Sequence, residues 1–170
     1  MRRLRILVIG AMSAGLAAGL ASPAGAVTRH EHVVGRWGGA VPCIPTSFDP
    51  TTGATVCVGS STWVGDLTGQ TTYTVTGIVD LSTGSGRGTI DETFAGRDRV
   101  GRVGTLRFAE TIVSRATGIP ATGAVLIDAH VVSATGGFAG FGGELIFRGV
   151  VNVLAGSFGD YAGQLVAPRP

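Results

Sequence analysis

Apolar and polar residues alternate with a period of two from about residue 61 to residue 166, and glycine-rich breaks separate the alternating segments. No stretch after the first 26 residues keeps the spacing that an amphipathic helix needs. The pattern predicts an all-β domain. The expected strands are residues 61–67, 71–81, 88–94, 103–114, 123–133, 143–153 and about 159–166.

The number of strands favours a closed architecture. About seven strands in a chain of this length form either a small antiparallel barrel or a sandwich, because both shield the edges of a long sheet. Periodicity alone does not distinguish the two. Residues 27–60 contain several prolines and the Gly38–Gly39 pair, and we expect an irregular N-terminal arm there, before a barrel domain at 61–166 and a loose tail at 167–170.

The first 26 residues have the organisation of a secretory signal peptide. Three arginines near the start precede an uncharged, apolar stretch at residues 6–21, and Ala24-Gly25-Ala26 supplies small residues for cleavage after Ala26. The alternative is an uncleaved anchor, but the stretch is shorter than the roughly 20 residues that span a bilayer. We expect a secreted, extracellular product without a membrane attachment.

The net charge of the chain changes sign once this segment is removed. The whole chain has 13 arginines, no lysine and 11 acidic residues, for a net charge of +2. Loss of Arg2, Arg3 and Arg5 leaves a slight negative excess, with the remaining arginines scattered among acids. Phosphate recognition needs clustered cations, so nucleic acid is not an expected partner. The absence of lysine also excludes Schiff-base and P-loop lysine chemistry.

Cys43 and Cys57 are the only two cysteines, and an even number in an exported chain indicates a disulfide. Thirteen residues separate them and include a turn-like segment at 49–53. A redox or metal pair is the alternative, but the C-x-x-C spacing and a completing histidine cluster are missing. We expect a structural bridge in the N-terminal region.

Three segments that contain glycine and an aromatic residue resemble parts of a known superfamily. Residues 134–145 (ATGGFAGFGGEL) resemble the T-G-x-F-x-x-x-x-G signature of allene oxide cyclase and dirigent-like barrels, and residues 159–163 (GDYAG) resemble their later G-x-Y-x-G segment. Residues 94–108 resemble an earlier hairpin of exported bacterial members. The resemblance implies a closed barrel of about eight strands, association into homo-oligomers, and cofactor-free cyclisation or isomerisation. No catalytic residue of the family transfers by position.

Two carboxylates fall on apolar strand faces. In residues 88–94 the apolar face also carries Glu92, and in residues 103–114 it also carries Glu110. Burial raises the pKa of a carboxyl group toward the range useful in acid–base chemistry, so both are candidate catalytic residues. The alternative is structural: arginine, threonine hydroxyls or water satisfy each group, or a bulge shifts the register.

Aromatic side chains on the same faces would shape a ligand site or fill the core. Trp63 and Tyr73 are expected in the core, and the candidate ligand-lining residues are Trp63, Tyr73, Phe94, Phe108 and Phe147. Phe138 and Phe141 would plug one barrel end.

Two other polar groups favour ordinary interpretations. Asp128 and His130 lie on the face opposite the apolar side chains of their strand and are expected to face solvent. The His30-Glu31-His32 run lacks a third metal ligand of known position and is expected to belong to a flexible polar arm. We therefore expect no metal and no cofactor.

Two functions remain. The first is a secreted barrel that binds an apolar small molecule, with or without catalysis of its cyclisation or isomerisation through orientation alone. The second is a non-catalytic extracellular structural or interaction module whose barrel is filled by its own side chains. The volume inside the barrel distinguishes them.

Overall fold

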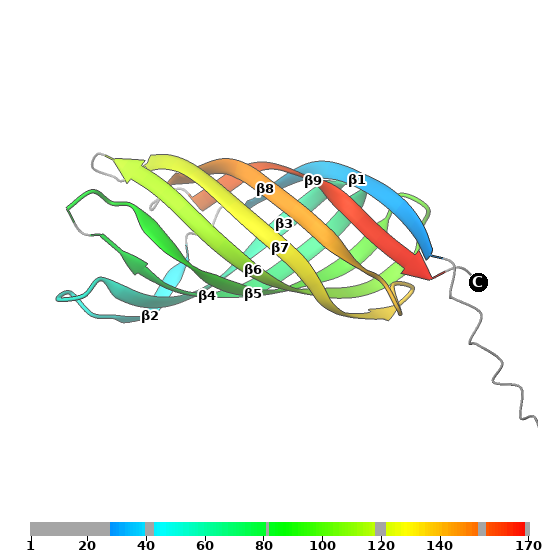
Figure 1. Ribbon diagram of the computed structural model, residues 1–170, viewed down its shortest axis with the longest axis horizontal. Coiled ribbons are helices and arrows are strands. Elements are labelled where there is room, and N and C mark those ends of the chain that lie inside the picture. Colours follow the sequence, from blue (N-terminus) through cyan, green and yellow to red (C-terminus); the bar gives the residue numbers. More distant parts are fainter. Residues whose placement is uncertain (1–27, 40–42, 81, 118–121, 153–155, 169–170) are drawn as a thin grey trace, which may run out of the picture.

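The computed structural model describes residues 28–39, 43–80, 82–117, 122–152 and 156–168; the expected signal peptide lies outside them. These residues form an elongated antiparallel barrel whose strands run obliquely to its long axis (Figure 1). No helix long and apolar enough to cross a membrane occurs in this part of the chain. The strands are β1 (Thr28–Gly39), β2 (Ile44–Phe48), β3 (Ala54–Gly65), β4 (Leu67–Val79), β5 (Gly86–Asp98), β6 (Val103–Thr117), β7 (Thr122–Gly136), β8 (Gly142–Asn152) and β9 (Gly156–Pro168).

Eight strands close the barrel and one lies outside it. The order of neighbours is β1-β9-β8-β7-β6-β5-β4-β3, and β1 also pairs with β3, which joins the two ends of the sheet. β2 pairs only with the first half of β3 and lies outside the closed wall (Figure 1). The prediction of an all-β, closed barrel of about eight strands is confirmed.

The N-terminal region is more regular than its sequence indicates. The expected irregular arm at 27–60 contains β1, β2 and the first half of β3, and the barrel begins at Thr28 instead of Ser61. Inward positions of β1 carry Glu31, Gly35 and Gly39 besides two apolar residues, so its alternation is hard to recognise. The expected tail is also shorter, because Ala167 and Pro168 pair with β1.

The predicted disulfide is present. Cys43 is bonded to Cys57, with their Cα atoms 5.5 Å apart. Cys57 is a buried residue of β3, and Cys43 directly precedes β2. The bridge therefore attaches the outside strand to the barrel wall at the point where the chain leaves β1.

Aromatic rings fill the middle of the barrel. Trp63 is only 1% exposed, and its ring lies 5.0–5.6 Å, between centroids, from four other aromatic rings. Phe138 and Phe141 of the β7–β8 connection are buried and contact each other, which confirms that they plug this end. Offset and tilted ring pairs stabilise such a core beyond their area alone. The rings around Trp63 are those of Phe94, Phe108, Phe147 and Tyr161.

A tyrosine spans the seam between β1 and β3. Only four residue pairs join these strands, from Gly35 with Gly65 to Gly38 with Thr62. Tyr161 of β9 lies under Gly35, and its hydroxyl group donates a hydrogen bond to the carbonyl oxygen of Leu67 and accepts one from the Leu67 amide, both 2.9 Å long. The tyrosine thus connects β9 to the start of β4 across the seam.

Replacement of Gly35 by alanine is expected to destabilise the barrel. A Cβ atom at this position would lie 2.3 Å from the Tyr161 hydroxyl oxygen, so the ring would have to move. We expect Gly35→Ala to lower the free energy of unfolding by about 1–3 kcal/mol, measured by urea denaturation. The matched control is Gly142→Ala in β8, where the new Cβ would meet nothing within 4 Å. Equal losses in the two variants would contradict this role of Tyr161.

Candidate functional site

Glu92 and Glu110 both face the barrel interior, as the alternation predicts. Glu92 of β5 is 6% exposed and Glu110 of β6 is 3% exposed. The register places Glu92 opposite Phe108 and Tyr73, and it places Glu110 opposite Ile90. The two carboxyl groups therefore occupy successive inward positions on adjacent strands.

Their surroundings treat the two groups differently. Burial raises the pKa of Glu92, while polar contacts with Glu110, Thr71 and Trp63 oppose that rise. Thr71 is itself hydrogen-bonded to Ser61, with 2.8 Å between their hydroxyl oxygens. Glu92 therefore agrees in part with the structural alternative, because the hydroxyl group of Thr71 provides a polar contact to its carboxyl group.

Glu110 has no hydroxyl group or basic group as a partner, and its polar neighbour is the carboxyl group of Glu92. Neither of its carboxyl oxygens reaches a partner at full hydrogen-bond geometry among the described residues. Burial, and then the charge of Glu92, raise the pKa of Glu110 to about 10. Glu110 therefore keeps its proton at neutral pH and can donate one hydrogen bond. Most buried polar groups in proteins are fully satisfied, whereas the carboxyl group of Glu110 has only the carboxyl group of Glu92 beside it.

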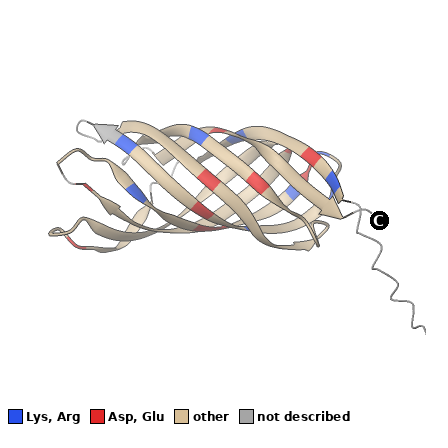
Figure 2. Cartoon of the chain, viewed as in Figure 1, with Lys and Arg blue, Asp and Glu red and all other residues tan. Residues whose placement is uncertain are grey.

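The interior contains no compensating cation. Every arginine in the described ranges is exposed except Arg102, which is half-buried beyond β5 and bonded to Glu31 and Asp98. Figure 2 shows the charged positions scattered along the barrel wall instead of gathered in one patch. The buried pair of carboxyl groups thus lacks a basic partner in this part of the molecule.

Solvent reaches the interior from the barrel end at which β4 ends and β5 begins. Inward side chains near this end, including Val75, Ile112 and Val151, are only half-buried, whereas those of the middle are buried. Glu110 is one inward position deeper than Ile112 on β6. The Nε1 atom of Trp37, near the same end, also lacks a hydrogen-bond partner. A molecule entering here would meet Glu110 before Glu92.

The structure separates the five candidate ligand-lining aromatics into two groups. Trp63, Phe94, Phe108 and Phe147 are at most 2% exposed, and the other three rings pack on that of Trp63. Tyr73 is half-buried and lies across Gly59 of β3. Burial, together with the charge of Glu92, raises the pKa of Tyr73. Only Tyr73 is therefore positioned toward the solvent-accessible end.

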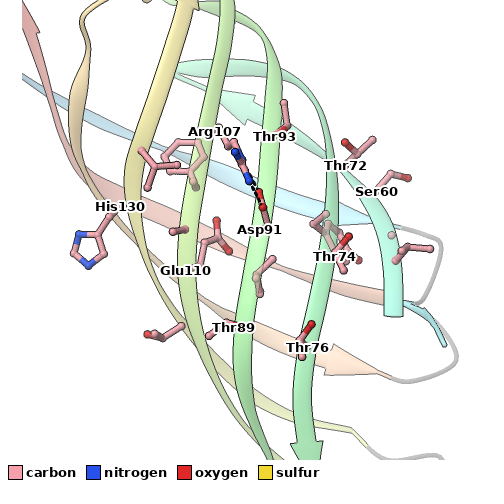
Figure 3. A pocket seen from close by; sticks show the side chains of 18 of the residues that line it. Ser60, Thr72, Thr74, Thr76, Thr89, Asp91, Thr93, Arg107, Glu110 and His130 are labelled. Atoms are coloured by element: carbon pink, nitrogen blue, oxygen red, sulfur yellow. Dashed lines mark hydrogen bonds and ion pairs between the residues drawn. The ribbon is translucent and has the colours of Figure 1, made fainter. Parts of the chain in front are cut away.

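A hollow on the outer wall was not predicted from the sequence. It has a volume of about 1,300 Å³ and extends over β3 to β7, next to the wall that carries Glu110 (Figure 3). Arg107 and Asp91 form an ion pair within it and are each about half exposed. The sequence shows that threonines occupy outward positions of these strands. Only the register between the strands shows that these threonines lie side by side. Figure 3 also labels these residues of its lining: Ser60, Thr72, Thr74, Thr76, Thr89, Thr93, His130 and Glu110, although the side chain of Glu110 is buried.

The second predicted polar pair lies outside the barrel, as expected. Asp128 and His130 are half-exposed, and His130 lies 3.7 Å from Asp128 and 3.3 Å from Glu144, between nitrogen and oxygen atoms. His130 borders the outer hollow and points away from the barrel (Figure 3). Its side chain and the carboxyl group of Glu110 face opposite sides of the barrel wall.

The expectation of a flexible polar arm at His30-Glu31-His32 is wrong. These residues belong to β1, and the buried carboxylate of Glu31 binds Arg29 and Arg102. The arginine hydrogen bonds, that of Arg102 foremost, lower the pKa of Glu31. His30 and His32 remain exposed, and no group of three or more potential metal ligands occurs in the described segments. This cluster ties the β5–β6 connection to β1.

Comparison with models of protein families, with curated proteins and with solved structures finds no match to this chain. The assignment of the fold therefore rests on strand order, register and burial. Functional arguments rest on the interior carboxyl groups and their surroundings.

Proton binding by Glu110 should make stability depend on pH. Its folded-state pKa is raised from 4.5 to about 10, so the folded state keeps a proton that the unfolded state releases above pH 4.5. Stability from this group is greatest at low pH and falls as the pH rises through this window, by about 1.4 kcal/mol per pH unit at most. We expect Glu110→Gln to lessen this decline in urea unfolding at pH 5, 7 and 8.5.

Glu144→Gln, on the exposed face of β8, makes the same chemical change without burial. It should reproduce the pH profile of the unmodified protein. Parallel profiles for Glu110→Gln and the unmodified protein would contradict a protonated Glu110.

Proposed function

We propose that this protein is an exported β-barrel that binds an apolar small molecule carrying a polar group, through the interior carboxyl pair. The observation that carries the proposal is the unpartnered, buried carboxyl group of Glu110. An unsatisfied buried polar group costs about 1–3 kcal/mol, and a ligand that supplies its partner recovers this free energy. The half-buried inward side chains around Ile112 mark the route of entry.

The roles of the surrounding residues follow from their positions. Glu110 supplies the polar contact, Glu92 tunes the proton affinity of Glu110, and Tyr73 contributes an aromatic wall nearer to solvent. The packed rings around Trp63 form the floor, which limits how deep a ligand reaches. A site of this kind needs no cofactor.

The catalytic form of the proposal is a cofactor-free cyclase or isomerase. An acid with a pKa of about 10 is a weak proton donor at neutral pH, but it donates a strong hydrogen bond in a dry interior. Confinement of a flexible substrate in one conformation lowers the barrier by orientation. The resemblance of residues 134–145 and 159–163 to allene oxide cyclase and dirigent-like barrels supports this chemistry.

Export and self-association belong to the same proposal. The arginines and apolar residues of the first 26 positions support secretion, and the Cys43–Cys57 disulfide is consistent with an oxidising compartment. The resemblance supports homo-oligomers. N-terminal sequencing of protein from the culture medium should find Val27 as the first residue.

A second candidate function is a non-catalytic structural or interaction module. Its supporting observation is the ring packing around Trp63, which fills the middle of the barrel. The binding surface would then be the outer hollow, where Ile44 and Val58 are exposed beside threonine hydroxyls.

Ligand retention and blocking of the open end separate the two candidates. Native mass spectrometry of protein from its own secretion medium should show a bound small molecule that denaturation releases. Ile112→Trp fills an inward, half-buried position and should abolish this extra mass. Val113→Trp, on the next, outward position of β6, is the matched control and should retain it.

Thermal unfolding verifies that both tryptophan variants are folded. Unmodified protein with no bound molecule, and with no change in melting temperature across a panel of apolar compounds, would overturn the binding proposal and favour the filled module.

A further inference from the structure

The barrel interior carries acidic groups without a basic counterpart. Glu92 and Glu110 occupy adjacent inward positions, and Glu110 is almost fully buried with both carboxyl oxygens unpartnered. The ion pairs of Asp91 and Glu31 use arginines of the wall and the plugged end. In the described chain no arginine lies inside near the pair. Buried carboxylates are normally paired or coordinated, and without a cation Glu110 stays neutral by keeping its proton.

Aromatic rings surround the same pair. Tyr73 and Phe108 lie directly opposite Glu92 on the neighbouring strands, and the Trp63 side chain also contacts Glu92. Aromatic rings attract cations, most strongly where water is excluded. Carboxyl groups with aromatic rings beside them suit a positively charged group on an apolar body better than they suit an anionic one.

We propose that the interior site binds an organic cation, in which a primary ammonium group attached to an apolar body donates hydrogen bonds to the free oxygens of Glu110 beside Glu92. The inference rests on the proposed function and specifies its ligand class. The ammonium group supplies hydrogen-bond donors and the positive charge that allows Glu110 to ionise.

Binding of such a ligand would release a proton. Glu110 is protonated in the free barrel; when the ammonium group binds, Glu110 gives its proton to solvent and the carboxylate pairs with the cation. The groups that face or influence Glu110 are Glu92 on β5, Tyr73 on β4 and, through the wall, Asp91 with its partner Arg107. β7 presents Ala129 to it. Affinity should therefore increase with pH until the ligand itself loses its charge.

Matched amine and alcohol probes test the charge requirement. Isothermal titration of the mature protein at pH 8 would compare butylamine with 1-butanol and 2-phenylethylamine with 2-phenylethanol. We expect each amine to bind about tenfold or more tightly than its alcohol, since charge-assisted hydrogen bonds are the stronger class. Titration in two buffers of different ionisation enthalpy should show up to one proton released per amine bound.

Variants of two glutamates test whether the amine preference and the proton release depend on Glu110. Glu110→Gln should remove the preference for the amine and the proton release, and the exposed Glu144→Gln should keep both. The proton count on unmodified protein provides a test that does not depend on how Glu110→Gln folds. Alcohols that bind as well as amines would overturn the inference and leave the proposed function standing. If neither amines nor alcohols bind, both the inference and the proposed function are overturned. If Glu110→Gln still prefers amines, the ligand site does not lie at Glu110.

Discussion

Closure at the seam between β1 and β3 is the constraint on which the rest of the molecule depends. Four residue pairs join these strands, and Tyr161 reinforces them by bonding both backbone groups of Leu67. The ring of Tyr161 needs the space left by the missing side chain of Gly35. Asp66 adds a third connection, because its backbone and its carboxylate both bond to Val34. Without this seam the structure would be an open, curved sheet with wet faces.

The closed wall gives the buried acids their chemistry. A carboxyl group on an open sheet would be solvated and ionised, whereas inside the barrel burial makes Glu110 a neutral acid. Side chains inside the closed wall determine which end is dry. Phe138 and Phe141 seal the end near the β7–β8 connection, and the inward glycines and half-buried aliphatic residues leave the opposite end accessible. The difference between the sealed end and the accessible end thus follows from the positions of the large inward side chains.

Much of the barrel was predictable because its central strands alternate cleanly. β5 to β9 follow the expected segments within a few residues, and the inward positions of Glu92 and Glu110 follow from alternation alone. β1 was missed because glycine and Glu31 occupy inward positions, and β2 because all five of its residues are exposed. The outer hollow and the unpartnered state of Glu110 depend on register between strands, which one sequence does not specify.

The pairing of β1 with β9 has a consequence for the order in which the chain can fold. Thr28 lies opposite Pro168 and Gly39 opposite Ser157, so the first strand pairs along its whole length with the last. Hairpins from β3 to β8 can form before β9 is available, but β1 has to wait for β9, apart from its short contact with β3. Pairings so distant in sequence form slowly. The two interior acids therefore stay hydrated through most of folding and lose their water only when the final strand docks.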